Sequence, residues 1–155
     1  MTVIAEQLSS RGLVSDELFE RLVDRIAAEE PTTREFAERI MEQALAFLYA
    51  CAGNCSERLS PSATVDIGWH TFILYTHEYA EFCDRIAGRF IHHVPDDGPT
   101  GDEWPTVPNA NAAALAATVA AMRRAGYHVD LPLWSTSRAA DCTQCHAGCT
   151  DSPTR

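Results

Sequence analysis

Apolar residues recur every three or four positions along much of the chain, and this period predicts helices rather than strands. The first such stretch follows Ser15, a good helix cap, and ends before Pro31. The second begins after Thr32 and ends near Gly53. Because its last half is apolar on almost every side, we expect this second helix at the centre of a bundle.

A third apolar stripe predicts one long helix from Thr64 to Ala87, closed by Gly88. Gly68 lies inside this helix, where glycine costs about 1 kcal/mol of helix propensity relative to alanine. A glycine kept at such a position often marks the place where a neighbouring helix crosses closely. We therefore expect the start of this helix to pack tightly against the core.

The remainder of the chain is less regular. Residues 89–95 should be extended, residues 96–109 form a loop rich in Pro, Gly and Asp, and an alanine-rich helix runs from Asn111 to Gly126. The expected fold is all-α, a small bundle of about four helices with a long Pro/Gly loop. We divide it into a helical domain over residues 1–135 and an irregular Cys-rich tail over residues 136–155.

Composition and charge narrow the classes of function. A chain of 155 residues with 46% hydrophobic residues can bury a core without disulfides. Its net charge of -10 and the lack of a Lys/Arg stripe argue against nucleic acid and against an anionic membrane surface. With no long apolar run and no basic N-terminal segment, we expect a cytoplasmic protein whose 6 cysteines are thiols or metal ligands.

The tail concentrates metal-binding residue types. Its candidate ligands are Cys142, Cys145, His146 and Cys149. Two-residue spacing between cysteines is typical of zinc sites because one tight turn presents both sulfurs to the ion. The fourth ligand could instead be Cys51 or Cys55. An iron–sulfur cluster and a thiol redox pair are alternatives, and the haem-attachment pattern Cys142-x-x-Cys145-His146 would require export.

A second candidate site lies on the third predicted helix. Asp66 and His70 are four residues apart and therefore share one helical face, with His77 two turns further along. His92 and His93 follow the glycine stop, and a reversal of the chain would return one of them to the helix. One carboxylate and two histidines suit iron(II), or zinc with a bound water.

The same region carries a resemblance. The segment Val65-Asp66-Ile67-Gly68-Trp69-His70-Thr71 resembles a Val-Asp-x-x-Trp-His-Thr segment of glycine-rich-domain-containing proteins. Together with Tyr79, Phe82-Cys83 and Phe90-Ile91-His92-His93, it also resembles a group of small uncharacterised actinobacterial proteins. The resemblance covers Ser60 to Pro95 and implies no activity, and the chain lacks the glycine-rich region of the larger proteins.

We therefore expect a small metal-binding protein, with zinc held by the cysteine tail, in an accessory or regulatory role with a protein partner or as a homodimer. A small metalloenzyme centred on Asp66, His70 and His92 or His93, with zinc or iron, is the alternative. A structural or interaction module without metal is the third. The chain has no Gly-x-Ser-x-Gly elbow, phosphate-binding loop or His-Glu-x-x-His motif, so hydrolase, nucleotide-binding and metalloprotease classes lack support.

Overall fold

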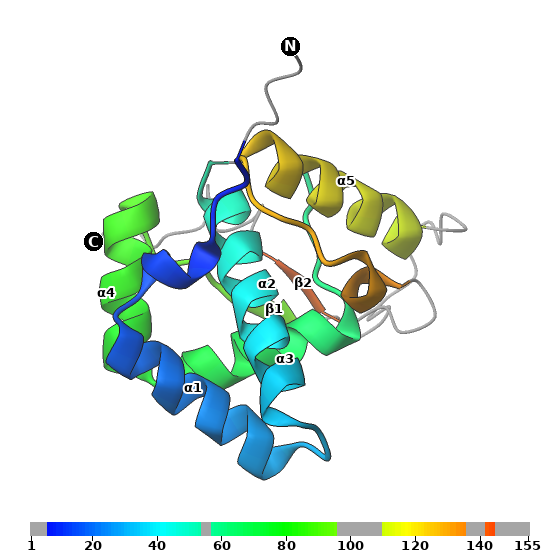
Figure 1. Ribbon diagram of the computed structural model, residues 1–155. Coiled ribbons are helices and arrows are strands. Elements are labelled where there is room, and N and C mark those ends of the chain that lie inside the picture. Colours follow the sequence, from blue (N-terminus) through cyan, green and yellow to red (C-terminus); the bar gives the residue numbers. More distant parts are fainter. Residues whose placement is uncertain (1–5, 54–56, 96–109, 136–141, 145–155) are drawn as a thin grey trace.

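The computed structural model describes residues 6–53, 57–95, 110–135 and 142–144, and its fold is all-α, as expected (Figure 1). The helices are α1 (Asp16–Glu29), α2 (Arg34–Gly53), α3 (Ala63–Leu74), α4 (Thr76–Ala87) and α5 (Ala110–Arg124), with short 3-10 turns η1 (Ser10–Leu13) and η2 (Leu131–Trp134). Two short strands, β1 (His93–Pro95) and β2 (Cys142–Gln144), pair antiparallel. The division into a helical domain and a tail stays a prediction, because only residues 142–144 of the tail are described.

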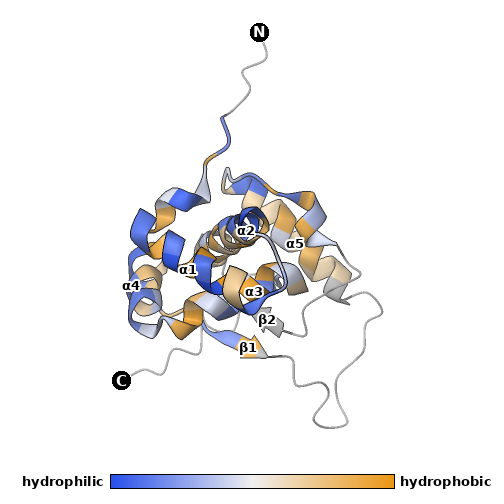
Figure 2. Ribbon diagram, turned by 60° about the horizontal axis from the view of Figure 1, so that its bottom comes forward, coloured by the Kyte–Doolittle hydropathy of each residue, from blue (hydrophilic) through white to orange (hydrophobic). Residues whose placement is uncertain are grey.

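Helix α2 lies at the centre of the bundle, with α1, α3 and α5 packed around it (Figure 1). Its buried residues come from nearly every side of the helix, and they include Ile40, Met41, Ala44, Leu45, Phe47, Leu48 and Cys51. Figure 2 shows that hydrophilic residues gather on the outer face of α1, which is amphipathic. The prediction that the second helix lies at the centre of the bundle is confirmed.

Helix α1 begins where its cap predicts. The Oγ of Ser15 accepts a hydrogen bond from the backbone N–H of Leu18 at 3.2 Å, which satisfies one of the donors left open at a helix start. The buried face of α1 consists of Phe19, Leu22, Val23 and Ile26. This helix could be predicted from sequence because the capping residue and the helical spacing of the apolar residues indicate the same helix.

The prediction of one helix from Thr64 to Ala87 is wrong, because the chain breaks at Tyr75. Tyr75 has φ -88° and ψ 66°, and its N–H donates to the carbonyl of Phe72 at 3.0 Å, a 3-10 contact that ends α3. Phe72 and Tyr79 would be about 10.5 Å apart along a continuous helix axis. The break brings their ring centroids to 5.2 Å, so both rings enter one core.

Gly68 marks a close crossing, as predicted. A Cβ atom at this position would lie 2.7 Å from the Cβ of Ala44 and 3.2 Å from the Cγ2 of Ile40, both on α2. Real Cβ atoms do not approach so closely, so only glycine permits this distance between α2 and α3. Because of this close crossing, the first turns of α3 pack directly against the core, and Asp66 and His70 lie at the edge of the core.

The chain after α5 is fastened to α2 by one buried side chain. The Nε2 of Gln43 donates to the carbonyl of His128 at 3.1 Å, and its Oε1 accepts from the N–H of Asp130 at 3.0 Å and from the indole of Trp134 at 2.8 Å. Residues 128–134 are thereby held across the bundle. Within the described ranges, no helix has both the length and the apolarity needed to cross a membrane.

Candidate metal centre

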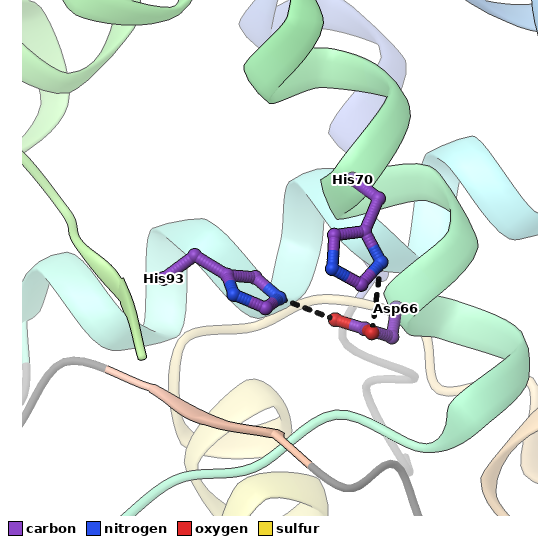
Figure 3. A group of neighbouring side chains, drawn as sticks. All are labelled: Asp66, His70 and His93. Carbon is purple, nitrogen blue, oxygen red and sulfur yellow. Dashed lines mark hydrogen bonds and ion pairs between the residues drawn. The ribbon is translucent and has the colours of Figure 1, made fainter. Parts of the chain in front are cut away.

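One carboxylate and two imidazoles meet between α3 and β1 (Figure 3). The Oδ2 of Asp66 lies 3.0 Å from the Nδ1 of His70, and its Oδ1 lies 3.1 Å from the Nε2 of His93. The side chains of Asp66 and His93 are only 7% and 12% exposed, whereas that of His70 is 56% exposed. The group is therefore buried on one side and open to water on the other.

The start of α3 positions the first two residues. The Oγ of Ser62 caps the helix by accepting from the N–H of Val65 at 3.1 Å. Asp66 follows in the first turn, where the helix dipole favours a negative charge, and His70 lies one turn later on the same face. This half of the group follows directly from local sequence.

The third residue reaches the group through a buried hydrogen-bond chain. Gly88 ends α4 with a φ of 65°, and the chain then turns back toward α3. The indole N–H of Trp69 donates to the hydroxyl of Tyr79 at 2.9 Å, and that hydroxyl donates to the carbonyl of Ile91 at 2.6 Å. Burial raises the pKa of Tyr79 well above its ordinary value, so the hydroxyl stays a donor and fixes the segment before His93.

Two aromatic rings of α3 pack against the imidazole of His93. Its centroid lies 4.3 Å from that of Trp69 and 4.3 Å from that of His70. Trp69 is itself completely buried and packs edge-on against Phe47 of α2. His93 is therefore held in one orientation by packing as well as by its contact with Asp66.

The arrangement has the chemistry of a transition-metal site. One ligand atom from each of Asp66, His70 and His93 lies within 4.8 Å of the others, so the group could hold one metal ion. Imidazole nitrogen and carboxylate oxygen are ligands of zinc and of iron(II). The contacts between Asp66 and the two imidazoles hold the three side chains near one another before any ion arrives.

Not every predicted histidine joins this group. His93 is the first residue of β1, whereas His92 precedes the strand, and the ring centroid of His92 lies 4.9 Å from that of Phe90. His77 belongs to α4 because of the break at Tyr75, and its side chain is 83% exposed beside Glu81. The group therefore contains His93 but neither His92 nor His77.

The tail candidates Cys145, His146 and Cys149 lie outside the described residues, as does Cys55, the alternative fourth ligand. For Cys142 the structure describes the backbone, which lies in β2. Cys51 and Cys83 are both completely buried in the bundle, where each acts as a small core residue.

Sequence reasoning missed the hydroxyl of Tyr79. Tyr79 falls on the apolar stripe of the third predicted helix, and that position accounts for its ring alone. A tyrosine in the core usually finds a hydrogen-bond partner for its hydroxyl, and that requirement was a usable signal. Here the partner is the carbonyl of Ile91, in the segment that carries His93.

Comparison with known proteins identifies a protein family that matches this chain. No curated protein and no solved structure matches the chain, so the link to glycine-rich-domain-containing proteins and the actinobacterial origin stay predictions. The UCP032817-like family model matches residues 10–100, which include Asp66, His70 and His93 and more than half of the 155 residues. On this match, the chain belongs to the UCP032817-like family.

Proposed function

We propose that this protein binds one divalent transition-metal ion, zinc by preference, through Asp66, His70 and His93. The observation that carries the proposal is the convergence of three ligand atoms within 4.8 Å from segments 27 residues apart. Such convergence needs a folded bundle, because His93 of β1 must lie against the first turns of α3.

The ligand set favours zinc over the common alkaline-earth ions. Calcium prefers six to eight oxygen ligands and magnesium an octahedron of oxygens, whereas two imidazoles and one carboxylate suit zinc. The net charge of -10 also attracts divalent cations to the protein surface. Among first-row ions, zinc binds such sites more strongly than iron(II).

An enzymatic role is the second candidate, favoured by the exposure of His70. Three protein ligands beside a solvent-facing side leave a coordination position for water, as in catalytic zinc sites. A water held there would have a lowered pKa and could act as a nucleophile. An accessory or regulatory role would need no such open position.

Zinc titration of the full chain by calorimetry tests the proposal. We expect Asp66→Asn and His93→Gln to weaken zinc binding at the high-affinity site by at least about 100-fold, because each removes a ligand and the contact that holds its neighbour. His77→Gln is the matched control, since His77 and Glu81 form a similar pair four residues apart on an exposed face.

The control should bind zinc as the wild type does. If Asp66→Asn bound zinc unchanged while a variant with Cys142, Cys145 and Cys149 all changed to Ser lost it, the ion would belong to the tail. That result would contradict the proposal. A wild-type protein without measurable zinc affinity would contradict it as well.

A further inference from the structure

The outward face of α3 is apolar although this helix lies at the surface of the bundle. Ile67, His70 and Leu74 follow the three- and four-residue spacing that sets side chains on one side of a helix. Ile67 is partly buried, His70 is exposed, and Leu74 is 59% exposed. Asp66, the one carboxylate of α3, is buried, and the helix has no Lys or Arg. These three residues form an apolar strip, the α3 face, with the candidate ligand His70 at its middle.

The other helices expose charge. Helices α1, α2 and α4 carry exposed carboxylates, among them Asp24, Glu35 and Glu81. Helix α5 exposes mainly alanine, which offers little apolar area, and it ends in the exposed Arg123 and Arg124. Among the helix surfaces whose side chains the structure describes, only the α3 face combines large apolar groups with an absence of exposed carboxylates and guanidinium groups.

Charge decides which partner fits the α3 face. A net charge of -10 makes two copies of the chain repel each other. A two-fold interface sets the same patch of both copies face to face, so exposed carboxylates near the axis would meet carboxylates. The α3 face avoids this contact and is therefore self-complementary. A basic partner would instead be attracted to the carboxylates of α1, α2 and α4.

We infer that a second copy of this chain docks on the α3 face and that zinc binding strengthens the dimer. The inference rests on the proposed function and names the partner of its site. When two α3 helices pack antiparallel about a two-fold axis, Ile67 of one copy meets Leu74 of the other, and the two His70 side chains flank the axis. The ions held by Asp66, His70 and His93 then lie beside the interface.

The metal site acts on this interface through charge. Each zinc ion adds two positive charges beside the α3 face of a strongly acidic chain, so two loaded copies repel each other less than two empty copies. By thermodynamic linkage, the dimer binds zinc more tightly than the monomer by the corresponding factor. A helix of 12 residues is only about 18 Å long. The interface is therefore small, and we expect a weak, reversible dimer.

Sedimentation equilibrium of the full chain, with and without one equivalent of zinc, tests the inference. We expect zinc to lower the dimer dissociation constant by about ten-fold, a usual size for coupling between two sites. Leu74→Glu should raise that constant by at least about 100-fold, because both copies carry the change and each carboxylate would be buried without a partner. The fold should persist, since Leu74 is exposed.

Leu131→Glu is the matched control. Leu131 is 54% exposed, much like Leu74, but it lies in η2, outside the α3 face. Its substitution adds the same charge to the chain and should leave the dimer unchanged. Both variants keep Asp66, His70 and His93, so calorimetry should show that both still bind zinc.

The outcomes separate this inference from the proposed function. A wild-type chain that binds zinc in calorimetry but stays monomeric would overturn the docking of a second copy and leave the proposed function intact. A dimer that Leu131→Glu disrupts and Leu74→Glu does not would overturn the docking as well. A dissociation constant that is the same with and without bound zinc would overturn the coupling. Zinc binding that is unchanged by Asp66→Asn would overturn the proposed function and the coupling together.

Discussion

Two buried polar side chains, Gln43 on α2 and Asp66 on α3, each fasten a distant segment to the bundle. Gln43 holds residues 128–134 through two backbone groups and the indole of Trp134. Asp66 holds β1 through an imidazole and contacts a second imidazole on its own helix. Both residues lie where two segments of the chain meet, but the chemical groups that they contact are different.

The kind of partner distinguishes a purely structural contact from a candidate metal site. A backbone N–H, a backbone carbonyl and an indole N–H neither titrate in the ordinary pH range nor serve as the usual ligands of zinc. An imidazole does both, and its free nitrogen can bind an ion that a carboxylate also contacts. We therefore assign Gln43 to stability alone, whereas Asp66 belongs to the proposed metal site.

The largest expected effect on stability comes from Gln43→Leu. It leaves three partner groups without their hydrogen bonds, and one unsatisfied buried group costs about 1–3 kcal/mol. We expect a loss of roughly 3 kcal/mol in the free energy of unfolding, measured by urea denaturation, because water can reach some of these groups. Zinc affinity should not change, and a large change in it would contradict the division between the two junctions.

Gly68→Ala should have the next largest effect. The added methyl group overlaps the Cβ of Ala44, and overpacking of a core costs about 1–3 kcal/mol, less the roughly 1 kcal/mol gained in helix propensity. Unlike Gln43→Leu, this substitution also moves the start of α3, so zinc affinity should fall together with the melting temperature. Gly12→Ala is the control, since a Cβ there meets nothing within 4 Å.

Tyr79→Phe should lower zinc affinity and stability together. The substitution keeps the buried ring but removes the hydroxyl that joins Trp69 to the carbonyl of Ile91, at a cost of about 1–2 kcal/mol. The segment carrying His93 then loses its anchor, and zinc should bind roughly ten-fold more weakly, a change typical of groups that orient metal ligands. Unchanged affinity in calorimetry would show that Tyr79 does not position His93.

The smallest effect concerns the salt bridge of Arg39 with Asp130. Arg39 lowers the pKa of Asp130 by a hydrogen bond and by its charge. This pair therefore stabilises the fold above the ordinary pKa of aspartate, and its contribution is lost as pH falls through the lowered value. Arg39→Gln should cost less than about 1 kcal/mol at neutral pH, and nothing in strong acid, in denaturation followed across pH. A difference that grows in acid would contradict this assignment.

The features that could be predicted from sequence are those that depend on interactions between residues close together in the chain. A cap and a period defined α1, and four-residue spacing joined Asp66 to His70. The break at Tyr75 could not be predicted, because the apolar stripe continues across it. The two helices become evident only from the packing of Phe72 and Tyr79 in one core. The choice of His93 over His92 depends on the hydrogen bond between Tyr79 and Ile91, which links residues on separate segments.

Nuclear magnetic resonance of the imidazole nitrogens tests the central claim most directly. Long-range correlation spectra of the full chain, recorded before and after one equivalent of zinc and assigned with His70→Gln and His93→Gln, report each histidine separately. We predict that the ring nitrogens of His70 and His93 shift on zinc binding while those of His77 and His92 do not. Bound zinc with the nitrogens of His70 and His93 unchanged would contradict the claim.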